Sequence, residues 1–147
     1  MRESLEDIDA IFLDLDGTIY LGNELIDGAL DFLQRCQQKG VRRFFLSNNS
    51  SRSVSQYLDK LLKFDIPAQE QDILLSTHDL LSWLGENNIT ETWLVGTKGM
   101  AQMLQDAGIT TDSESPQYVV LGYDTELTYE KIMTASIHMH AGVTLVA

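Results

Sequence analysis

Two aspartates spaced by one residue, Asp14 and Asp16, are the residues of this chain best suited to chemistry. They follow the apolar run Ile11–Leu13, which predicts a buried strand of a parallel sheet. Residues i and i+2 of a strand point to the same side, so we expect both carboxylates in one pocket at the strand's carboxyl end, where open α/β sheets bind ligands. Gly17 permits a tight turn there, and Thr18 offers a hydroxyl and a backbone N–H to an anion.

This arrangement suits phosphoryl transfer through an aspartyl-phosphate. A carboxylate is a competent nucleophile for a phosphoryl group when a metal offsets the charge repulsion. Carboxylate oxygens beside a phosphate suit Mg²⁺, which binds proteins through few ligands and keeps several waters. An Asp-Gly pair alone indicates only a turn. The apolar run, the spacing of the aspartates and the Gly-Thr after them together favour a functional site.

A second polar stretch, Ser47-Asn48-Asn49, comes after the predicted strand Val41–Leu46. Apolar residues at helical spacing between Ile26 and Cys36 predict a helix between the two strands, so this is a βαβ unit with parallel, neighbouring strands. A hydroxyl and two amides at a strand's carboxyl end form a neutral anion-binding cup. The alternative is an ordinary helix cap, because Ser and Asn are favoured there.

The stretch Asp14-Leu15-Asp16-Gly17-Thr18 resembles the first motif of the haloacid dehalogenase-like (HAD) phosphatases, and the rest of the chain is similar to their NagD and p-nitrophenyl phosphatase subgroup. The resemblance implies that Asp14 is the nucleophile. It implies that Asp16 is the general acid/base and that its backbone carbonyl also ligates Mg²⁺, so that both aspartates belong to the metal site.

The same resemblance assigns the phosphoryl-binding residues. It implies that Ser47, which matches the second motif, binds the transferred phosphoryl group. We expect the remaining substrate contacts at Gly17, Thr18, Asn48 and Asn49. Arg52 could contact the substrate or lie on a solvated helix, and these two interpretations are equally weighted.

The resemblance also implies the fold class, which is α/β. We expect the N-terminal part of a Rossmann-like core with a parallel sheet in residues 1–75, and part of an inserted α/β cap domain in residues 76–147. The second half agrees with this division, because the predicted strands Thr92–Gly96 and Tyr118–Leu121 each precede a helix that ends in Ala-Gly.

Further elements are predicted from hydrophobic spacing and turn signals. Ser76–Asp79 has the pattern of a capping box before a helix, and Tyr20–Asn23 is predicted to be a loop. The remaining predicted elements are a helix at Arg52–Lys63, a strand at Ile73–Leu75, a helix at Tyr129–His140 and a strand at Val143–Val146.

Several other residues carry weaker signals. The three histidines are expected to be structural or solvated, because no Cys or Asp array completes a zinc site. Met100, Met103, Met133 and Met139 are expected mainly in the core. Gly96-Thr97-Lys98-Gly99 lacks the complete phosphate-loop pattern and is discounted. Tyr123 and Asp124 could face a substrate or form an ordinary turn.

Composition limits the partners and the compartment. The net charge of −12, from 10 Lys and Arg against 22 Asp and Glu, disfavours nucleic acid and anionic membranes. The single cysteine, Cys36, excludes an internal disulfide and fits a reducing compartment. The acidic N-terminus does not resemble a signal peptide, and no apolar run is long enough to span a bilayer. We therefore expect a cytoplasmic protein.

Two motifs of the HAD pattern are absent from the chain. These are a lysine in a Gly-Lys-Pro context and a later acidic pair; Lys39, Lys60, Lys63, Lys98 and Lys131 stand in other contexts. The chain ends at Ala147 inside a predicted strand, so we expect the N-terminal portion of a longer phosphatase and no useful activity from this portion alone.

The expected function is Mg²⁺-dependent removal of phosphate from small phosphorylated metabolites, by a full-length protein that could form a homo-oligomer. The alternative is a non-catalytic remnant or a ligand-binding module on the same scaffold. A receiver-type regulator is disfavoured, because receivers carry their acidic pair on a different loop from the phosphoryl acceptor.

Overall fold

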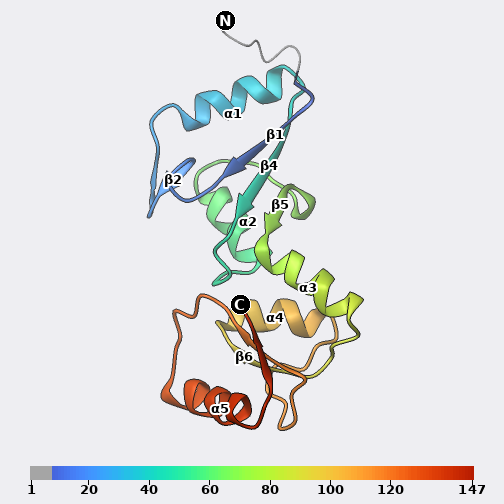
Figure 1. Ribbon diagram of the computed structural model, residues 1–147. Coiled ribbons are helices and arrows are strands. Elements are labelled where there is room, and N and C mark those ends of the chain that lie inside the picture. Colours follow the sequence, from blue (N-terminus) through green and yellow to red (C-terminus); the bar gives the residue numbers. More distant parts are fainter. Residues whose placement is uncertain (1–7) are drawn as a thin grey trace, which may run out of the picture. The chain divides into compact units, whose positions relative to one another are not determined.

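The computed structural model describes residues 8–147, which form two compact units (Figure 1). The first unit comprises the described residues up to Ser47 together with Tyr57–Leu74. The second comprises Asn48–Gln56 together with Leu75–Ala147. Each unit contains parallel strands, and helices alternate with strands along the chain, so the predicted α/β class is confirmed.

The first unit is built on a sheet with the strand order β1-β4-β5. Strands β1 and β4 are parallel, with Phe12 opposite Phe44 and Asp14 opposite Leu46, as the predicted βαβ unit requires. The elements of this part of the chain are β1 (Ala10–Asp14), β2 (Tyr20–Leu21), β3 (Glu24–Leu25), α1 (Ala29–Gln38), β4 (Arg42–Ser47), α2 (Val54–Lys63), a 3-10 turn (Glu70–Asp72) and β5 (Ile73–Leu75).

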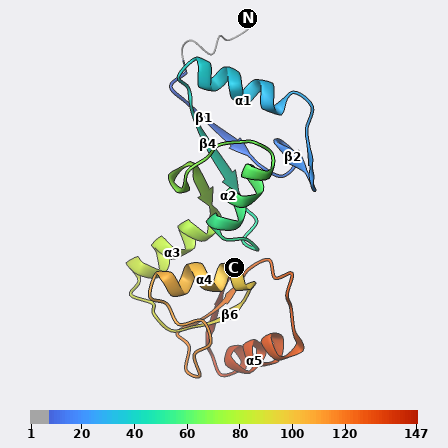
Figure 2. The same cartoon turned by 180° about the vertical axis from the view of Figure 1, so that it is seen from behind.

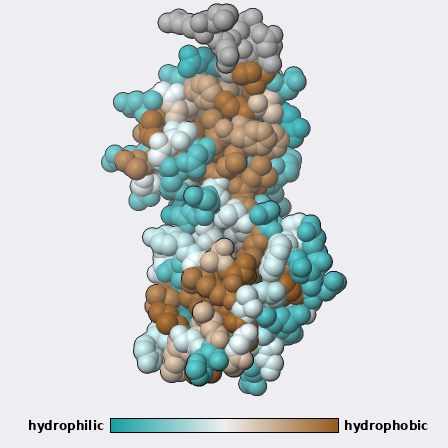
Figure 3. Space-filling view, viewed as in Figure 1, coloured by the Kyte–Doolittle hydropathy of each residue, from teal (hydrophilic) through white to brown (hydrophobic). Residues whose placement is uncertain are grey.

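The core of this unit lies on one face of the sheet. The chain crosses the sheet in one direction, from β1 to β4 and on to β5. Because crossovers of this kind are right-handed, α1 and α2 lie on the same side of the sheet. Leu13 and Phe45 are buried there, whereas Phe12, which alternates with Leu13, is 61% exposed and stacks on Phe44. Figure 2 shows α2 in front of β4, and Figure 3, taken from the opposite side, shows hydrophobic residues gathered over the other face.

The second unit carries a parallel sheet with the order β6-β7-β8. Helices cover both faces: Leu94 and Val120 pack with Met100 of α4, whereas Val119 packs with Ala135 of α5. No helix within residues 8–147 is long and apolar enough to cross a membrane. The elements are α3 (Ser76–Glu86), β6 (Thr92–Val95), α4 (Lys98–Asp106), β7 (Tyr118–Leu121), α5 (Tyr129–His140) and β8 (Thr144–Val146).

The loop predicted at Tyr20–Asn23 is wrong, because this segment forms half of an antiparallel hairpin. Strands β2 and β3 pair Tyr20 with Leu25 and Leu21 with Glu24. Gly22 has φ +59°, the conformation that the first central residue of a type II′ hairpin turn adopts. Strands of two residues are too short for an alternating pattern, so only the Gly-Asn turn indicated the hairpin.

The predicted capping box at Ser76–Asp79 is also wrong, because α3 already begins at Ser76. The N-cap residue is Leu75, whose N–H donates to Nδ1 of His78 at 3.2 Å. The Ser76 hydroxyl donates instead to the backbone carbonyl of Asn48 at 3.3 Å. A tertiary acceptor therefore competes successfully with the local cap, and His78 has the structural role that was expected.

Helix α5 packs through its polar and small residues. The indole N–H of Trp93 donates to the Lys131 carbonyl at 3.1 Å, and the His138 ring lies 5.6 Å from the Trp93 ring. The apolar stripe of the helix faces away, so Met133 and Met139 are each 43% exposed. The expectation of a core position is wrong for these two methionines and correct for Met100, which is 2% exposed.

Candidate functional site

The two aspartates lie at the carboxyl end of β1. Asp14 is the last residue of the strand and is exposed, whereas Leu15 is fully buried. The Asp16 side chain is 50% exposed. This exposed–buried–exposed alternation places both carboxylates on the solvent side of a well-anchored backbone, as the spacing of the aspartates predicts.

The turn after β1 uses backbone groups that were expected to be available to an anion. Gly17 has φ +88°, a left-handed conformation that explains the glycine. Its N–H donates to the Tyr20 carbonyl at 2.7 Å, and the Thr18 N–H donates to the Leu15 carbonyl at 3.3 Å. The Thr18 N–H thus has a partner within the turn, and the exposed Thr18 side chain carries a hydroxyl donor there.

Ser47 ends the neighbouring strand. Asp14 is paired with Leu46, so Ser47 lies one residue beyond Asp14 on the adjacent parallel strand. Ser47 is 6% exposed, and its Oγ lies 2.8 Å from the hydroxyl of Tyr57, a fully buried residue of α2. The structure thus brings the first and second sequence motifs together at one edge of the sheet in the first unit.

The segment after Ser47 is a turn rather than a helix cap. Oδ1 of Asn49 accepts the Ser51 N–H at 2.9 Å. Helix α2 is capped later by a reciprocal pair, in which the Ser53 N–H donates to Oε1 of Gln56 at 2.8 Å and the Gln56 N–H donates to Oγ of Ser53 at 3.4 Å. The alternative interpretation of Ser47-Asn48-Asn49 as a cap is therefore wrong. Asn48 and Asn49 group with the second unit.

A lysine that the sequence motifs did not single out lies at the Asp16 turn. Nζ of Lys60, on α2, is 3.8 Å from Oδ1 of Asp16 and 3.5 Å from the centre of the Tyr20 ring. The Lys60 side chain is only 12% exposed. A cation held over an aromatic face and beside a carboxylate adds positive charge next to Asp16.

The metal-binding capacity of this edge comes from the aspartates alone. Within residues 8–147 no group of three or more His, Cys, Asp or Glu side chains is placed to hold a metal ion. Asp14 and Asp16 nevertheless offer hard oxygen donors on an exposed turn. This donor set fits Mg²⁺, which commonly takes one or two carboxylates and completes its shell with water and phosphate.

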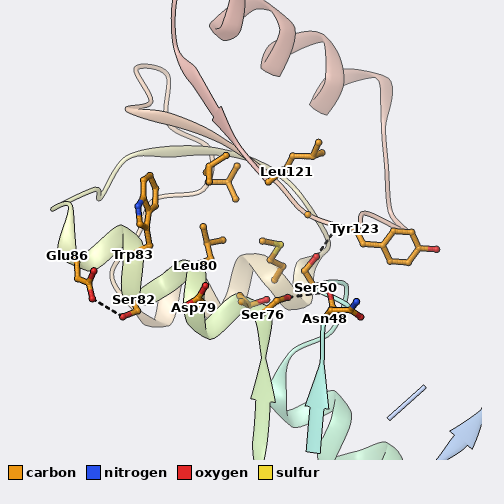
Figure 4. Close-up of a pocket in the computed structure, with 16 residues that line it drawn as sticks. Asn48, Ser50, Ser76, Asp79, Leu80, Ser82, Trp83, Glu86, Leu121 and Tyr123 are labelled. Atoms are coloured by element: carbon orange, nitrogen blue, oxygen red, sulfur yellow. Dashed lines mark hydrogen bonds between the residues drawn. The ribbon is translucent and has the colours of Figure 1, made fainter. Parts of the chain in front are cut away.

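A cavity of about 690 Å³ lies within the second unit (Figure 4). Its walls include Leu80 and Trp83 of α3 and Leu121 of β7, and Oγ of Ser50 on its rim accepts the Tyr123 N–H at 2.8 Å. Of the residues predicted to bind the phosphoryl group or the metal, only Asn48 lines it, and Tyr123, weighed as a further substrate contact, lines it too. Because it contains neither aspartate nor Ser47, we place the candidate site at the ends of β1 and β4 and not in this cavity.

The loop after β7 holds its acidic residue in a buried ion pair. The Asp124 side chain is 2% exposed and pairs with Nζ of Lys131 at 2.8 Å. The same ammonium donates to the Gly96 carbonyl at 2.7 Å. Asp124 is therefore a structural residue of the loop. Tyr123 is 64% exposed, and Thr97, in the discounted phosphate-loop segment, caps α4 through its hydroxyl.

A family model described as haloacid dehalogenase-like hydrolase matches residues 11–110 of the chain. Curated relatives agree. The 5'-nucleotidase YutF of Bacillus subtilis is 32% identical over 136 residues, which cover 92% of this chain and 53% of that protein. An acid sugar phosphatase of Staphylococcus aureus is 31% identical over 140 residues, which cover 94% of this chain and 54% of that protein.

Solved structures show the same likeness. The crystal structure of a 4-nitrophenylphosphatase from Thermotoga maritima superposes with a TM-score of 0.87 at 32% identity, covering 96% of this chain and 54% of that one. The chain spans about half the length of the relatives that it matches.

Proposed function

The chain belongs to the haloacid dehalogenase-like hydrolases, and from this we propose that the full-length protein carrying it is a phosphatase of small phosphorylated metabolites. One observation carries the proposal: Asp14 ends β1, Asp16 follows in the turn, and Ser47 ends the adjacent parallel strand β4 one residue beyond the partner of Asp14. Three relatives named for phosphate esters, a 5'-nucleotidase, an acid sugar phosphatase and a 4-nitrophenylphosphatase, support this substrate class.

In the proposed reaction, an oxygen of the Asp14 carboxylate attacks the phosphorus in line with the leaving oxygen. The new bond to Asp14 forms as the bond to the leaving oxygen breaks, and Asp16 donates a proton to that oxygen. Asp16 then takes a proton from the water that attacks the aspartyl-phosphate, which releases phosphate and restores Asp14. The Ser47 hydroxyl donates a hydrogen bond to a phosphoryl oxygen.

The cofactor in this proposal is Mg²⁺, with the Asp14 carboxylate and the Asp16 backbone carbonyl as its ligands from this chain. When bound, the ion offsets the repulsion between an anionic nucleophile and an anionic phosphate. The Lys60 ammonium, 3.8 Å from Asp16, is a positive charge of the protein itself that reduces the same repulsion. This positive charge is local to the site, whereas the chain as a whole has a net charge of −12.

We also propose how the parts of the chain are used. Residues 1–75 form part of the catalytic core, with Gly17, Thr18, Asn48 and Asn49 as further substrate contacts, and residues 76–147 form part of a cap. The separate parallel sheet β6-β7-β8 supports the cap assignment. The acidic composition and the single buried thiol, Cys36, favour a cytoplasmic enzyme with neither nucleic acid nor membrane as partner.

The proposal is tested by measuring p-nitrophenyl phosphate hydrolysis by the full-length protein with Mg²⁺ and with EDTA. Asp14→Asn keeps the size of the side chain and removes the nucleophile, so turnover should fall at least about a thousandfold. The matched control is Asp31→Asn, at an exposed aspartate of α1 in the same unit, which should retain wild-type turnover. An Asp14→Asn variant with a tenth of wild-type turnover would contradict the assignment.

The second candidate function is a phosphate-ester-binding module without catalysis. The observation that favours it is the absence, within residues 8–147, of a third acidic or histidine ligand beside Asp14 and Asp16. The same assay separates the two functions, since a binding module would bind p-nitrophenyl phosphate through Ser47 but would release no nitrophenol.

A further inference from the structure

We propose that Tyr57 is a positioning residue of the phosphoryl site: it donates a hydrogen bond to Ser47 and so directs the serine proton toward the phosphoryl group. The inference rests on the proposed function and adds a residue to it. Its basis is the 2.8 Å contact between the Tyr57 hydroxyl and Oγ of Ser47. Tyr57 is fully buried, and Ser47 is 6% exposed.

The direction of this hydrogen bond decides what Ser47 can do. Each hydroxyl has one proton to donate and lone pairs to accept. If Ser47 donated to Tyr57, its proton would point into the core, and the serine could not donate to a phosphoryl oxygen, which only accepts. If Tyr57 donates, this hydrogen bond does not use the Ser47 proton, so it is compatible with donation by Ser47 to a phosphoryl oxygen.

Chemistry favours donation by Tyr57. A phenol is more acidic than an aliphatic alcohol and is therefore the stronger donor of the two. An oxygen that accepts a hydrogen bond also becomes a better donor, because hydrogen bonds in a chain polarise one another. A series of hydrogen bonds from Tyr57 through Ser47 to an anionic phosphoryl oxygen thus runs in the direction of increasing negative charge.

Helix α2 holds Tyr57 rigidly enough for this role. The Ser53–Gln56 pair caps α2, which begins at Val54, three residues before Tyr57. Leu61, one turn after Tyr57 on the same face, is fully buried. A buried tyrosine ring has few rotamers, so its hydroxyl is fixed before any ligand arrives. Lys60, three residues along the same helix, reaches Asp16. One face of α2 therefore contacts both motifs of the proposed site.

The test is a double-mutant cycle in the full-length protein. Tyr57→Phe removes one oxygen and keeps the ring, and Ser47→Ala removes its partner. We expect Tyr57→Phe to lower kcat/KM for p-nitrophenyl phosphate about tenfold, mainly through kcat, because the bond orients a donor needed in the transition state. The double variant should match Ser47→Ala within about twofold, since Tyr57 has nothing left to position.

The matched control is Tyr118→Phe on β7, where the ring packs edge-on against Trp83 at 5.3 Å. This change should leave kcat/KM unaltered, which shows that loss of a tyrosine hydroxyl is harmless elsewhere. Ser47→Thr keeps a hydroxyl at position 47, so adding Tyr57→Phe to it should again cost about tenfold in kcat/KM.

Two results would overturn the inference alone: unchanged kcat/KM in Tyr57→Phe, or losses that multiply in the double variant, as they would if Tyr57 only supported the core. Faster turnover in Tyr57→Phe would show that Ser47 is the donor in the native pair and would also overturn it. Wild-type hydrolysis that does not depend on Asp14 would overturn the proposed function, and this assignment with it. The Asp14→Asn control separates that case from the others.

Discussion

Asp14 and Asp16 stand two residues apart and are held in different ways. Asp14 ends a strand and is paired in the ladder opposite Leu46, so its backbone is fixed. Asp16 lies in the turn beyond, beside the ammonium of Lys60. A rigid position suits a nucleophile that must attack in line, and a turn suits a residue that serves first the leaving oxygen and then a water.

The role of Asp16 predicts a dependence on the leaving group. Asp16→Asn should lower kcat/KM for an alkyl phosphate about a thousandfold, since the alkoxide must be protonated as it leaves. For p-nitrophenyl phosphate the loss should be about tenfold, because nitrophenolate leaves without much help. The parameter kcat/KM excludes hydrolysis of the intermediate, so it isolates this step. Equal losses for the two substrates would remove Asp16 from the acid role.

Ser47 should stabilise the transferred group without being attacked. Ser47→Ala is expected to cost about 2–4 kcal/mol of transition-state stabilisation, the scale of one lost preorganised donor. The measurement is kcat/KM for p-nitrophenyl phosphate, with Ser136→Ala on α5 as the control for loss of a serine hydroxyl in a helix. Trapping a phosphoserine at position 47 would exchange the roles of Ser47 and Asp14.

At the scale of elements, regular hydrophobic patterns predicted most of the fold. The predicted strands Ile73–Leu75 and Tyr118–Leu121 and the predicted helix Tyr129–His140 have the same bounds in the structure. The two strands are short apolar runs, and the helix lies between the N-cap Thr128 and the Ala-Gly pair that follows it. The hairpin at Tyr20–Leu25 was missed because each of its strands has only two residues.

The supporting contacts of the site could not be predicted in the same way. Tyr57 belongs to an apolar stripe of the sequence. Its hydroxyl comes within hydrogen-bond distance of Ser47 only when α2 packs against the end of β4. Lys60 has no distinguishing neighbours in the sequence, and only the fold brings it to the Asp16 turn. Contacts between elements distant in the sequence depend on packing, which spacing alone does not encode. A polar atom within an apolar stripe was the only signal available.

The loop after β7 provides a test of an element's stability. Asp124 is 2% exposed and pairs with Lys131 at 2.8 Å, so Lys131→Met leaves a buried carboxylate without its cation. We expect the free energy of unfolding to fall by about 2–4 kcal/mol, as for breaking a buried ion pair. Urea denaturation measures this change. Adding Asp124→Leu should restore part of the loss, and a single-variant loss below about 0.5 kcal/mol would contradict the ion pair's structural role.

At the scale of the whole molecule, the described residues carry the proposed nucleophile, acid/base and phosphoryl donor, but no group of three or more His, Cys, Asp or Glu side chains among them is placed to hold a metal. We therefore predict that residues 1–147, expressed alone, bind Mg²⁺ weakly and hydrolyse p-nitrophenyl phosphate no faster than their own Asp14→Asn variant. Calorimetric Mg²⁺ titration and nitrophenol release measure the two properties. Hydrolysis well above the variant, from a monodisperse folded sample, would show that these residues suffice for catalysis.

The most direct test of the central claim identifies the residue that carries the phosphoryl group. The full-length protein is mixed with p-nitrophenyl phosphate and Mg²⁺, quenched in acid during turnover and reduced with borohydride, which converts an aspartyl-phosphate to homoserine. Asp16→Asn, which slows hydrolysis of the intermediate, raises the trapped fraction. Peptide mass spectrometry of the sample with substrate should then find homoserine at position 14. A control sample without substrate should keep aspartate at that position. Unmodified Asp14 throughout turnover, with phosphate on Ser47 or on no residue, would contradict the proposed mechanism.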